Sequence, residues 1–137
     1  MNLRLLDALS RMADALVAEL EADACAISRV IGDVLILVAE RVSGGGTLQM
    51  GQGYLVPDFP ETAHVLSSRE PRALTLDDPV VDEAEARVLR EHGFGSLLML
   101  PLVLNESVWG LVEVYRTTRR AFVDADVSRA QALTHLT

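Results

Sequence analysis

Apolar residues follow two different spacings along the chain, and the change from one to the other predicts its secondary structure. In residues 3–21, leucine and alanine recur every three or four positions, which places them on one face of an α-helix. Residues 24–30 and 34–42 are instead apolar runs rich in branched side chains, and the turn residues between them predict a β-hairpin. The chain therefore opens with an amphipathic helix followed by two paired strands.

Glycine and proline interrupt these patterns in the middle of the chain. Residues 43–53 hold five of the nine glycines and predict a mobile loop. Asp58 and Glu61 have the spacing of a helix capping box. With Pro60 in the first turn, a short helix is expected over 60–68.

A brief strand and a second short helix are predicted next. Residues 72–76 have the character of a strand that ends at an acidic turn. Asp82 and Glu85 again have capping-box spacing, and Gly93 suits the left-handed conformation that follows a helix C-terminus. A helix over about 81–92 follows from these signals.

The last third of the chain contains the most apolar segment. Residues 95–104 are almost entirely apolar and 107–115 return after a turn, which predicts a central hairpin covered on both faces. Asp124 and Asp126 then favour the start of a helix through the helix dipole. The apolar side of this helix is expected to include Leu136. No stop signal follows, so the helix is expected to continue in a longer protein.

The order of these elements predicts an α+β fold. Strands joined by hairpins, with helices at both ends of the chain, favour an antiparallel sheet on which the terminal helices pack. The regular alternation of a doubly wound parallel sheet is absent. Because the chain has 137 residues and is 50% hydrophobic, residues 1–137 are expected to form a single domain with a sizeable core.

Composition narrows the classes of partner. Twenty acidic residues against twelve basic ones give a formal charge of −8, which repels polyanions, so no nucleic-acid binding is expected. The apolar stretches are shorter than the roughly 20 residues that a membrane span needs, and no secretory signal opens the sequence. A cytoplasmic protein without membrane association is expected.

The residue types and motifs of common catalytic sites are missing. All basic residues are arginine, which excludes mechanisms that depend on a lysine. The patterns GxxxxGK[ST], GxGxxG, GxSxG and HExxH do not occur. Cys25 is the only cysteine, so an internal disulfide and a multi-cysteine zinc site are excluded. We therefore expect neither an enzyme nor a metal site.

The glycine-rich loop and the short helices must lie over the apolar sheet, an arrangement that often encloses a small ligand. The residues in this region that are suited to contact a ligand are Tyr54, Phe59, His64, Arg72 and His92. Among these, Arg72 is a possible charge partner for an anionic ligand. The alternative is that large side chains of this region fill the pocket themselves.

Several segments resemble, in their order, the GAF domain, a small-molecule sensing and dimerisation module of signalling proteins. Residues 95–102 (GSLLMLPL) and 109–115 (WGLVEVY) look like the family's central hairpin, and 122–126 (FVDAD) looks like the entry to its last helix. Residues 69–71 and 77–79 are similar to the edge of its pocket. The resemblance implies a GAF/PAS-like antiparallel sheet of about six strands, terminal helices on one face and short helices over a ligand pocket.

The family's cyclic-nucleotide-binding members can be compared with this chain residue by residue. Phe122 and Asp126 fit their pattern. Arg116 and Thr117 stand near a position where those members carry an Asn-Lys pair, and Val127 follows Asp126 where they have glutamate. Cyclic GMP and cyclic AMP are therefore disfavoured as ligands.

Other ligand classes of the family depend on cysteine or histidine. Bilin-binding members attach the pigment to a cysteine of the pocket helices, whereas Cys25 falls in the first predicted strand, so a covalent bilin is disfavoured. The family's free methionine sulfoxide reductases need several cysteines. Haem-binding members offer a histidine close to where His92 falls, so a haem-based gas or redox sensor that uses His92 or His64 is one alternative.

The leading hypothesis from the sequence is a non-catalytic sensory or regulatory domain of a larger, bacterial-type signalling protein. The resemblance implies that it binds an unknown small molecule, forms a homodimer through its terminal helices and controls a linked output domain. The first alternative is a purely structural dimerisation module whose pocket is filled by its own side chains.

Overall fold

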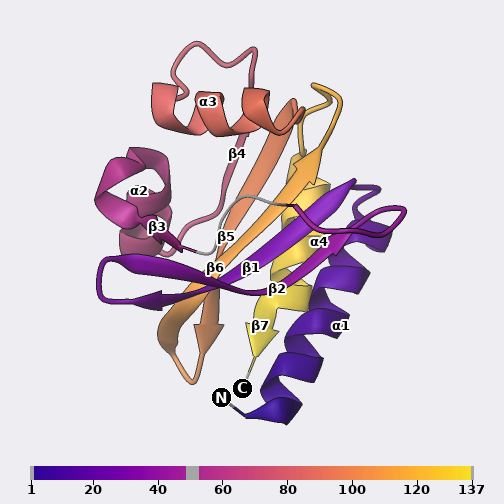
Figure 1. Ribbon diagram of the computed structural model, residues 1–137, viewed down its shortest axis with the longest axis vertical. Coiled ribbons are helices and arrows are strands. Elements are labelled where there is room, and N and C mark those ends of the chain that lie inside the picture. The colour runs from indigo at the N-terminus through magenta and orange to yellow at the C-terminus, as the bar shows by residue number, and fades with distance from the viewer. Residues whose placement is uncertain (1, 49–52, 137) are drawn as a thin grey trace.

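The computed structural model describes residues 2–48 and 53–136 and shows an antiparallel sheet with helices on both faces (Figure 1). Within these residues, the sheet has a six-strand path in the order β3-β2-β1-β6-β5-β4. The strands are β1 Ala24–Ile31, β2 Val34–Val42, β3 Gly53–Leu55, β4 Arg72–Thr75, β5 Ser96–Leu104 and β6 Ser107–Arg116. The predicted α+β fold with about six antiparallel strands is confirmed.

The helices divide between the two faces of the sheet. α1 (Leu3–Glu19) and α4 (Asp124–Thr134) contact each other and pack on one face, as predicted for the terminal helices. α2 (Pro60–Ser68) and α3 (Glu83–Glu91) lie over the other face, and Figure 1 shows the two pairs on opposite sides. We call α2 and α3 together the lid. In the described part of the chain, no helix is long and apolar enough to cross a membrane.

Burial on both faces explains the continuous apolar run of the central hairpin. Leu98 and Leu100 of β5 belong to the core beneath α1 and α4. Their neighbours Leu97 and Met99 belong to the core beneath the lid. Successive side chains of a strand point to opposite faces, so a strand that lies between two helix layers needs apolar residues at every position. The expectation of a hairpin covered on both faces is confirmed.

Left-handed backbone conformations form the two hairpin turns. Gly32 between β1 and β2 has a φ of 60°, and Asn105 and Glu106 between β5 and β6 have φ values of 51° and 68°. Two consecutive positive φ angles match the twist of the flanking strands. Farther along β6, a Cβ added at Gly110 would lie 2.0 Å from the carbonyl oxygen of Ser28, so glycine is required where β6 approaches β1.

The lid helices begin and end where predicted, but only one of them has the predicted cap. Asp82 is the N-cap of α3, and its Oδ1 accepts a hydrogen bond from the backbone N–H of Glu85 at 2.7 Å. For α2, the predicted cap at Asp58 is wrong, because the N-cap is Phe59, which has no side-chain acceptor. Instead, Oδ2 of Asp82 accepts from the backbone N–H of Glu61 at 3.1 Å. One carboxylate therefore holds the N-termini of both lid helices.

Two short strands depart from the predictions. The predicted loop over 43–53 is described only in part, because residues 49–52 lie outside the described residues, and Gly53 already begins the unpredicted strand β3. The last helix was expected to include Leu136, but α4 ends at Thr134. His135–Leu136 then form β7, which pairs in parallel with Val103 and Leu104 of β5. Backbone pairing with an adjacent strand therefore replaces the last helical turn.

A buried arginine joins the terminal helices to the sheet. The side chain of Arg116, at the end of β6, is 2% exposed and lies 3.9 Å from the ring centroid of Phe122. Its guanidinium donates to the backbone carbonyls of Leu20 and Ala121 and pairs with Asp126 at 3.6 Å. Among the described buried side-chain nitrogen and oxygen atoms, its Nε has no partner. Burial lowers the pKa of Arg116, and the carboxylate of Asp126 opposes that shift.

Candidate functional site

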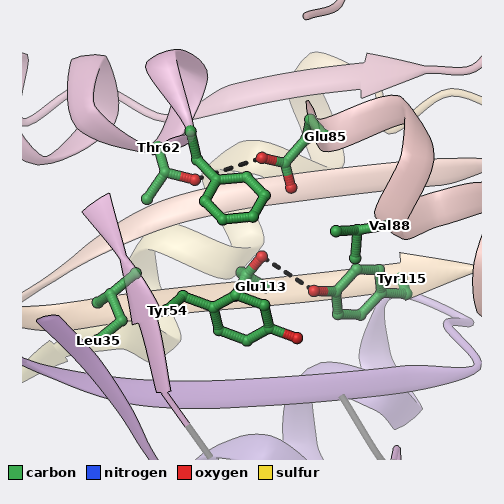
Figure 2. A pocket seen from close by; sticks show the side chains of 8 residues that line it. Leu35, Tyr54, Thr62, Glu85, Val88, Glu113 and Tyr115 are labelled. Atoms are coloured by element: carbon green, nitrogen blue, oxygen red, sulfur yellow. Dashed lines mark hydrogen bonds between the residues drawn. The ribbon is translucent and has the colours of Figure 1, made fainter. Parts of the chain in front are cut away.

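A pocket lies between the sheet and the lid. Figure 2 shows side chains that converge on it from the edge of the sheet, from its centre and from both lid helices. The described residues that line it are Leu35, Tyr54, Phe59, Thr62, Glu85, Val88, Glu113 and Tyr115. Most of the lining is apolar or aromatic, and two carboxylates are set into it.

The register of the sheet places Glu113 under the lid. Glu113 lies in β6 opposite Ala26 of β1 and Met99 of β5, and both of these partners face the lid side. Tyr115 lies two residues farther along β6 and therefore points to the same face. The carboxylate of Glu113 is thus presented to the pocket from one of the central strands.

Tyr115 holds the Glu113 carboxylate from the sheet side. Its hydroxyl donates a hydrogen bond to Oε2 of Glu113 at 2.9 Å. The ring of Tyr115 is 1% exposed and stacks on Phe94, with the ring centroids 4.7 Å apart and the planes at 23°. Because this stacking fixes the ring, it also fixes the hydroxyl that orients Glu113.

Glu85 faces the pocket from the lid. It lies in the first turn of α3, is 3% exposed and accepts a 3.4 Å hydrogen bond from the hydroxyl of Thr62 in α2. The same hydroxyl lies 3.5 Å from the sulfur of Met99 in β5. Thr62 therefore touches both the lid carboxylate and the sheet.

Burial raises the pKa of both pocket carboxyls. The pKa of Glu85 rises to about 8, first because burial disfavours the charged form and then because of the negative charges of Glu113 and Asp82, against the hydrogen bond from Thr62. Burial raises the pKa of Glu113 to about 7, and the hydrogen bond from Tyr115 works in the opposite direction. Near neutral pH, each carboxyl can therefore gain or lose its proton.

The pocket is nearly filled in this conformation. The free volume among its lining side chains is about 20 Å³, which holds roughly one water molecule. A ligand larger than that would have to displace side chains or lie partly outside the pocket. The lid is the natural part to move, because it consists of two short helices.

Two of the five predicted ligand contacts line this pocket. Tyr54 of β3 and Phe59 at the start of α2 form an edge-to-face pair, with ring centroids 5.6 Å apart and planes at 82°. Both side chains are half-buried. Burial raises the pKa of Tyr54 to about 12, and the negative charges of Glu113 and Glu85 add to that shift. The tyrosine is therefore neutral at physiological pH.

The two predicted histidine contacts lie outside the lining of the pocket. His64 is exposed on α2, where the helix turns that side chain away from the sheet. His92 is the C-cap residue of α3, and its Nδ1 lies 2.9 Å from the carbonyl oxygen of Val88. Since neither imidazole lines the pocket, the described residues offer no histidine ligand there for a haem iron.

Arg72 is also separate from the pocket lining. It lies in the edge strand β4, where its Nε donates to Glu61 at 2.9 Å and its Nη2 to Asp78 at 3.4 Å. Two carboxylates therefore already balance its charge. Its predicted role as the partner of an anionic ligand has no support in this geometry.

Sequence reasoning missed the polar half of the pocket: Thr62, Glu85, Glu113 and Tyr115. A signal for one of them was present, because Glu113 interrupts an otherwise apolar strand. Its burial depends on the lid, which the strand pattern does not show. Glu85 fitted the capping-box pattern, which hid its second role.

Cys25 lies on the opposite face of the sheet from the pocket. It is fully buried in the core beneath α1 and α4. Burial raises the pKa of its thiol well above the usual range, so the reactive thiolate is disfavoured. Among the described residues, no group of three or more histidine, cysteine, aspartate or glutamate side chains could hold a metal ion.

The family comparison and the comparison with solved structures both point to the GAF domain. The GAF domain family matches residues 4–137, while no curated protein matches the chain. The phycoerythrobilin-bound GAF domain of a cyanobacterial phytochrome is 18% identical, with a TM-score of 0.81 over 96% of this chain and 82% of that one. The blue-light-absorbing form of the Thermosynechococcus elongatus PixJ GAF domain is also 18% identical, with a TM-score of 0.78 over 95% and 80%.

A longer solved structure matches as well. The chromophore-binding domain of Stigmatella aurantiaca bacteriophytochrome, as a Thr289His mutant, is 15% identical, with a TM-score of 0.77. The match covers 95% of this chain and 51% of that one, so the present chain spans about half its length. At these identities, the likeness is one of fold.

Proposed function

This chain belongs to the GAF domain family, and from that premise we propose that it is a non-catalytic sensory domain that binds a small molecule between its sheet and its lid. The observation that carries the proposal is the pocket itself. It brings two carboxylates and two tyrosines together between the sheet and two short helices, and no basic residue is among its described lining. Polar groups that a stable core does not need are typical of a binding site.

The ligand would act through the position of the lid. Asp82 holds the N-termini of α2 and α3 together, so the two helices are expected to shift as one unit when the pocket is filled. The strands beneath them also carry the terminal helices on their opposite face. A shift of β6 or β5 would therefore reach α1 and α4, whose packing against a second copy would change.

Homodimerisation through the terminal helices has a physical basis in α1. Leu3 is 80% exposed, and Leu6 lies one helical turn away and is half-buried. Apolar side chains on the outer side of a helix favour contact with a second copy. In a larger cytoplasmic, bacterial-type protein, a linked output domain would receive the signal through these helices.

The bound molecule would be held without a covalent bond. The neighbouring solved structures include bilin-bound GAF domains, but Cys25 is buried on the face away from the pocket. Attachment of a pigment at this cysteine would require the core beneath α1 to open. Cyclic nucleotides are disfavoured for a different reason, since their phosphate would meet the carboxylates of Glu85 and Glu113.

A structural dimerisation module is the second candidate function. The small free volume of the pocket, about 20 Å³, is the observation that favours it. In this case Tyr54, Phe59 and Tyr115 complete the core, and no ligand enters.

Native mass spectrometry of gently purified protein separates these two functions. We expect the wild-type domain to retain a small molecule and Val88→Phe, which fills the pocket, to lose it. Val80→Phe is the matched control, because Val80 is 69% exposed and outside the pocket lining. Absence of any bound mass in wild type, together with a dimer, would favour the structural module and contradict the sensory proposal.

The same spectra report the oligomeric state. Wild type should be a dimer, and Leu3→Glu combined with Leu6→Glu should convert it to a monomer. Leu55→Glu is the control, because Leu55 is 54% exposed at the sheet edge, far from α1 in sequence and on a different element. A dimer that survives the α1 substitutions would place the interface elsewhere.

A further inference from the structure

We infer that the pocket selects a cationic ligand, the ammonium group of a protonated amine, which it holds between the carboxylates of Glu85 and Glu113. The inference rests on the proposed small-molecule function and adds the chemical class of the ligand. It stands on the charges that line the pocket, on their placement, on the size of the free space and on the aromatic walls.

The charge lining the pocket is of one sign. Among the described residues that line it, Glu85 and Glu113 are acidic and none is basic. The nearby Arg72 is already paired with Glu61 and Asp78. A buried carboxylate is normally balanced by a cation from its own protein. Here that cation has to come from outside or be replaced by a proton.

The two carboxylates approach the free space from opposite sides. Figure 2 shows Glu85 descending from α3 and Glu113 rising from the sheet, with the ring of Tyr54 beside them. Within residues 2–48 and 53–136, the Glu113 carboxylate accepts a hydrogen bond from Tyr115 and the Glu85 carboxylate accepts one from Thr62. Each carboxylate has capacity for further donors, and an ammonium group supplies three.

The size of the space suits this head group. About 20 Å³ is free among the lining side chains, which matches a water-sized group such as –NH₃⁺ and excludes a bulky head group unless the lid moves. The body of the ligand would lie toward the aromatic pair Tyr54 and Phe59. Their rings offer aromatic surface against which an apolar ligand body can pack.

An ammonium group would take the place of a proton. Without a ligand, burial raises the pKa of Glu113 to about 7, and burial together with the negative charge of Glu113 raises that of Glu85 to about 8, so the empty pocket retains at least part of one proton at neutral pH. Binding of a cation favours the charged carboxylates and releases this proton. Affinity should therefore rise with pH between about pH 6 and about pH 8, as linkage requires.

Other titratable groups also contribute to the charge around Glu85 and Glu113. The negative charges of Asp82 and Glu61 raise the pKa of Glu85 from the N-termini of the lid helices. The titratable groups that interact with the pair are Tyr54 on β3, Glu61 on α2, Asp82 at the N-cap of α3 and Tyr115 on β6. All of them are acids, so none supplies the missing positive charge.

Binding of a cation would also link the lid to the sheet. Glu85 belongs to α3 and Glu113 to β6, so an ammonium group between them bridges the two layers. Because Asp82 joins α3 to α2, the bridge would act on the whole lid. Charge recognition would therefore also fix the position of the lid.

Benzylamine is a suitable probe, with benzyl alcohol and benzoate as neutral and anionic molecules of matched shape. Their affinities would be measured by amide chemical shifts in NMR titrations at about pH 8 and about pH 6. We expect benzylamine to bind wild type at least about tenfold more tightly than benzyl alcohol at the higher pH, with shifts in β6 and α3. Lowering the pH should weaken the affinity for benzylamine about threefold or more and leave the affinity for benzyl alcohol unchanged.

Glu113→Gln should remove the preference for the amine, because it takes away one charge and keeps the shape. Glu83→Gln is the matched control: it removes one charge from the exposed side of α3, outside the pocket lining, and should keep the preference. Because Glu113→Gln removes a buried charge, the variant should remain folded, which the same spectra verify.

The outcomes separate this inference from the proposed function. Equal binding of benzylamine and benzyl alcohol, tighter binding of benzoate, or absence of shifts with benzylamine would each overturn the inference. If native spectra nevertheless show a bound small molecule that Val88→Phe removes, the sensory function stands and only the ligand class is wrong. If they show none, both are wrong.

Discussion

The two faces of the sheet treat buried charge in opposite ways. Beneath α1 and α4, the guanidinium of Arg116 is surrounded by backbone carbonyls, the ring of Phe122 and the carboxylate of Asp126. Beneath the lid, Glu85 and Glu113 are held by hydroxyl groups, and no basic residue is among the described lining of their pocket. One face has its charge balanced internally, and the other does not.

This difference separates a buried charge that serves the fold from buried charges that are suited to bind a ligand. A buried charge with its own counter-charge is satisfied whether or not a ligand is present, so it serves the fold. A buried charge without one stays sensitive to protons and ligands, which is typical of a functional site.

Removing the balanced charge of Arg116 should have the largest effect on the stability of the fold. Arg116→Ala leaves the carbonyls of Leu20 and Ala121 without their donor and the carboxylate of Asp126 without its partner. Loss of one member of a buried pair lowers the free energy of unfolding by about 3–5 kcal/mol. Urea unfolding followed by circular dichroism measures this loss.

Arg119→Ala is the control for that variant. Arg119 pairs with Asp77 at 2.6 Å on the surface, where both side chains are more than half exposed. Exposed pairs contribute at most about 1 kcal/mol. Equal losses for the two arginine variants would mean that the buried side chain does not join the terminal helices to the sheet.

The unbalanced carboxyls should make stability depend on pH. Their pKa values in the folded domain, about 8 and about 7, lie above the ordinary value of a glutamate. At pH values between the ordinary pKa and these raised ones, the folded state therefore binds more protons than the unfolded chain. Stability is therefore fully present below the ordinary pKa and is lost as pH rises through about 7 to 8. From about pH 6 to about pH 8.5 we expect a loss on the order of 2 kcal/mol, measured by thermal unfolding.

Glu85→Gln sharpens the same comparison. It should flatten the pH dependence and make the domain more stable than wild type at about pH 8.5, because a neutral amide replaces a buried charge. Glu83→Gln, on the exposed side of α3, should leave the dependence as in wild type. A flat wild-type profile would show that the two carboxyls are balanced by a contact that this conformation does not contain.

Loss of the shared cap should destabilise the lid by a smaller amount. Asp82→Ala removes hydrogen bonds to the backbone of Glu61 and Glu85, and loss of a capping residue costs about 0.5–2 kcal/mol. Hydrogen exchange should accelerate in both α2 and α3, while α1 and α4 keep their protection. Asp82→Asn keeps one oxygen acceptor, so this variant should retain part of the stability and of the exchange protection that Asp82→Ala loses. Faster exchange in α3 alone would mean that the lid does not act as one unit.

The smallest effect is expected at His64. Its side chain is exposed and outside the pocket lining, so His64→Ala should change stability by less than about 0.5 kcal/mol. The affinity for benzylamine should stay within about twofold, measured by the same NMR titration. A tenfold loss of affinity would instead support the sequence-based prediction that His64 contacts the ligand.

Local signals in the sequence predicted most of the elements. Asp82 predicted the start of α3 and the Asn105-Glu106 pair predicted the turn of the central hairpin, because caps and turns depend on residues close together in the chain. The cap of α2 was wrong for the converse reason. Its acceptor, Asp82, lies 21 positions beyond Glu61, and no local pattern connects them.

The residues that line the pocket were predicted less well than the fold. Tyr54 and Phe59 were chosen because aromatic residues beside a loop over an apolar sheet are suited to line a pocket, and both are part of its lining. His64, Arg72 and His92 were chosen for their chemistry, but helix phase, a local ion pair and a helix C-terminus place them outside the lining. The direction of a side chain on a short helix depends on how the helix packs, which composition does not report.

By itself, the sequence determined the order of the elements, the antiparallel sheet, the two apolar faces of its central strands and the resemblance to the GAF family, because each depends on periodicity or on motifs of neighbouring residues. Only the tertiary structure decided which buried charges meet. Glu113 faces the lid because of its register with Ala26 and Met99, and Glu85 faces it because α3 packs over that face. The distance between groups remote in sequence, and the water excluded around them, arise only when the layers come together, and these set the pKa values and the chemistry of the pocket.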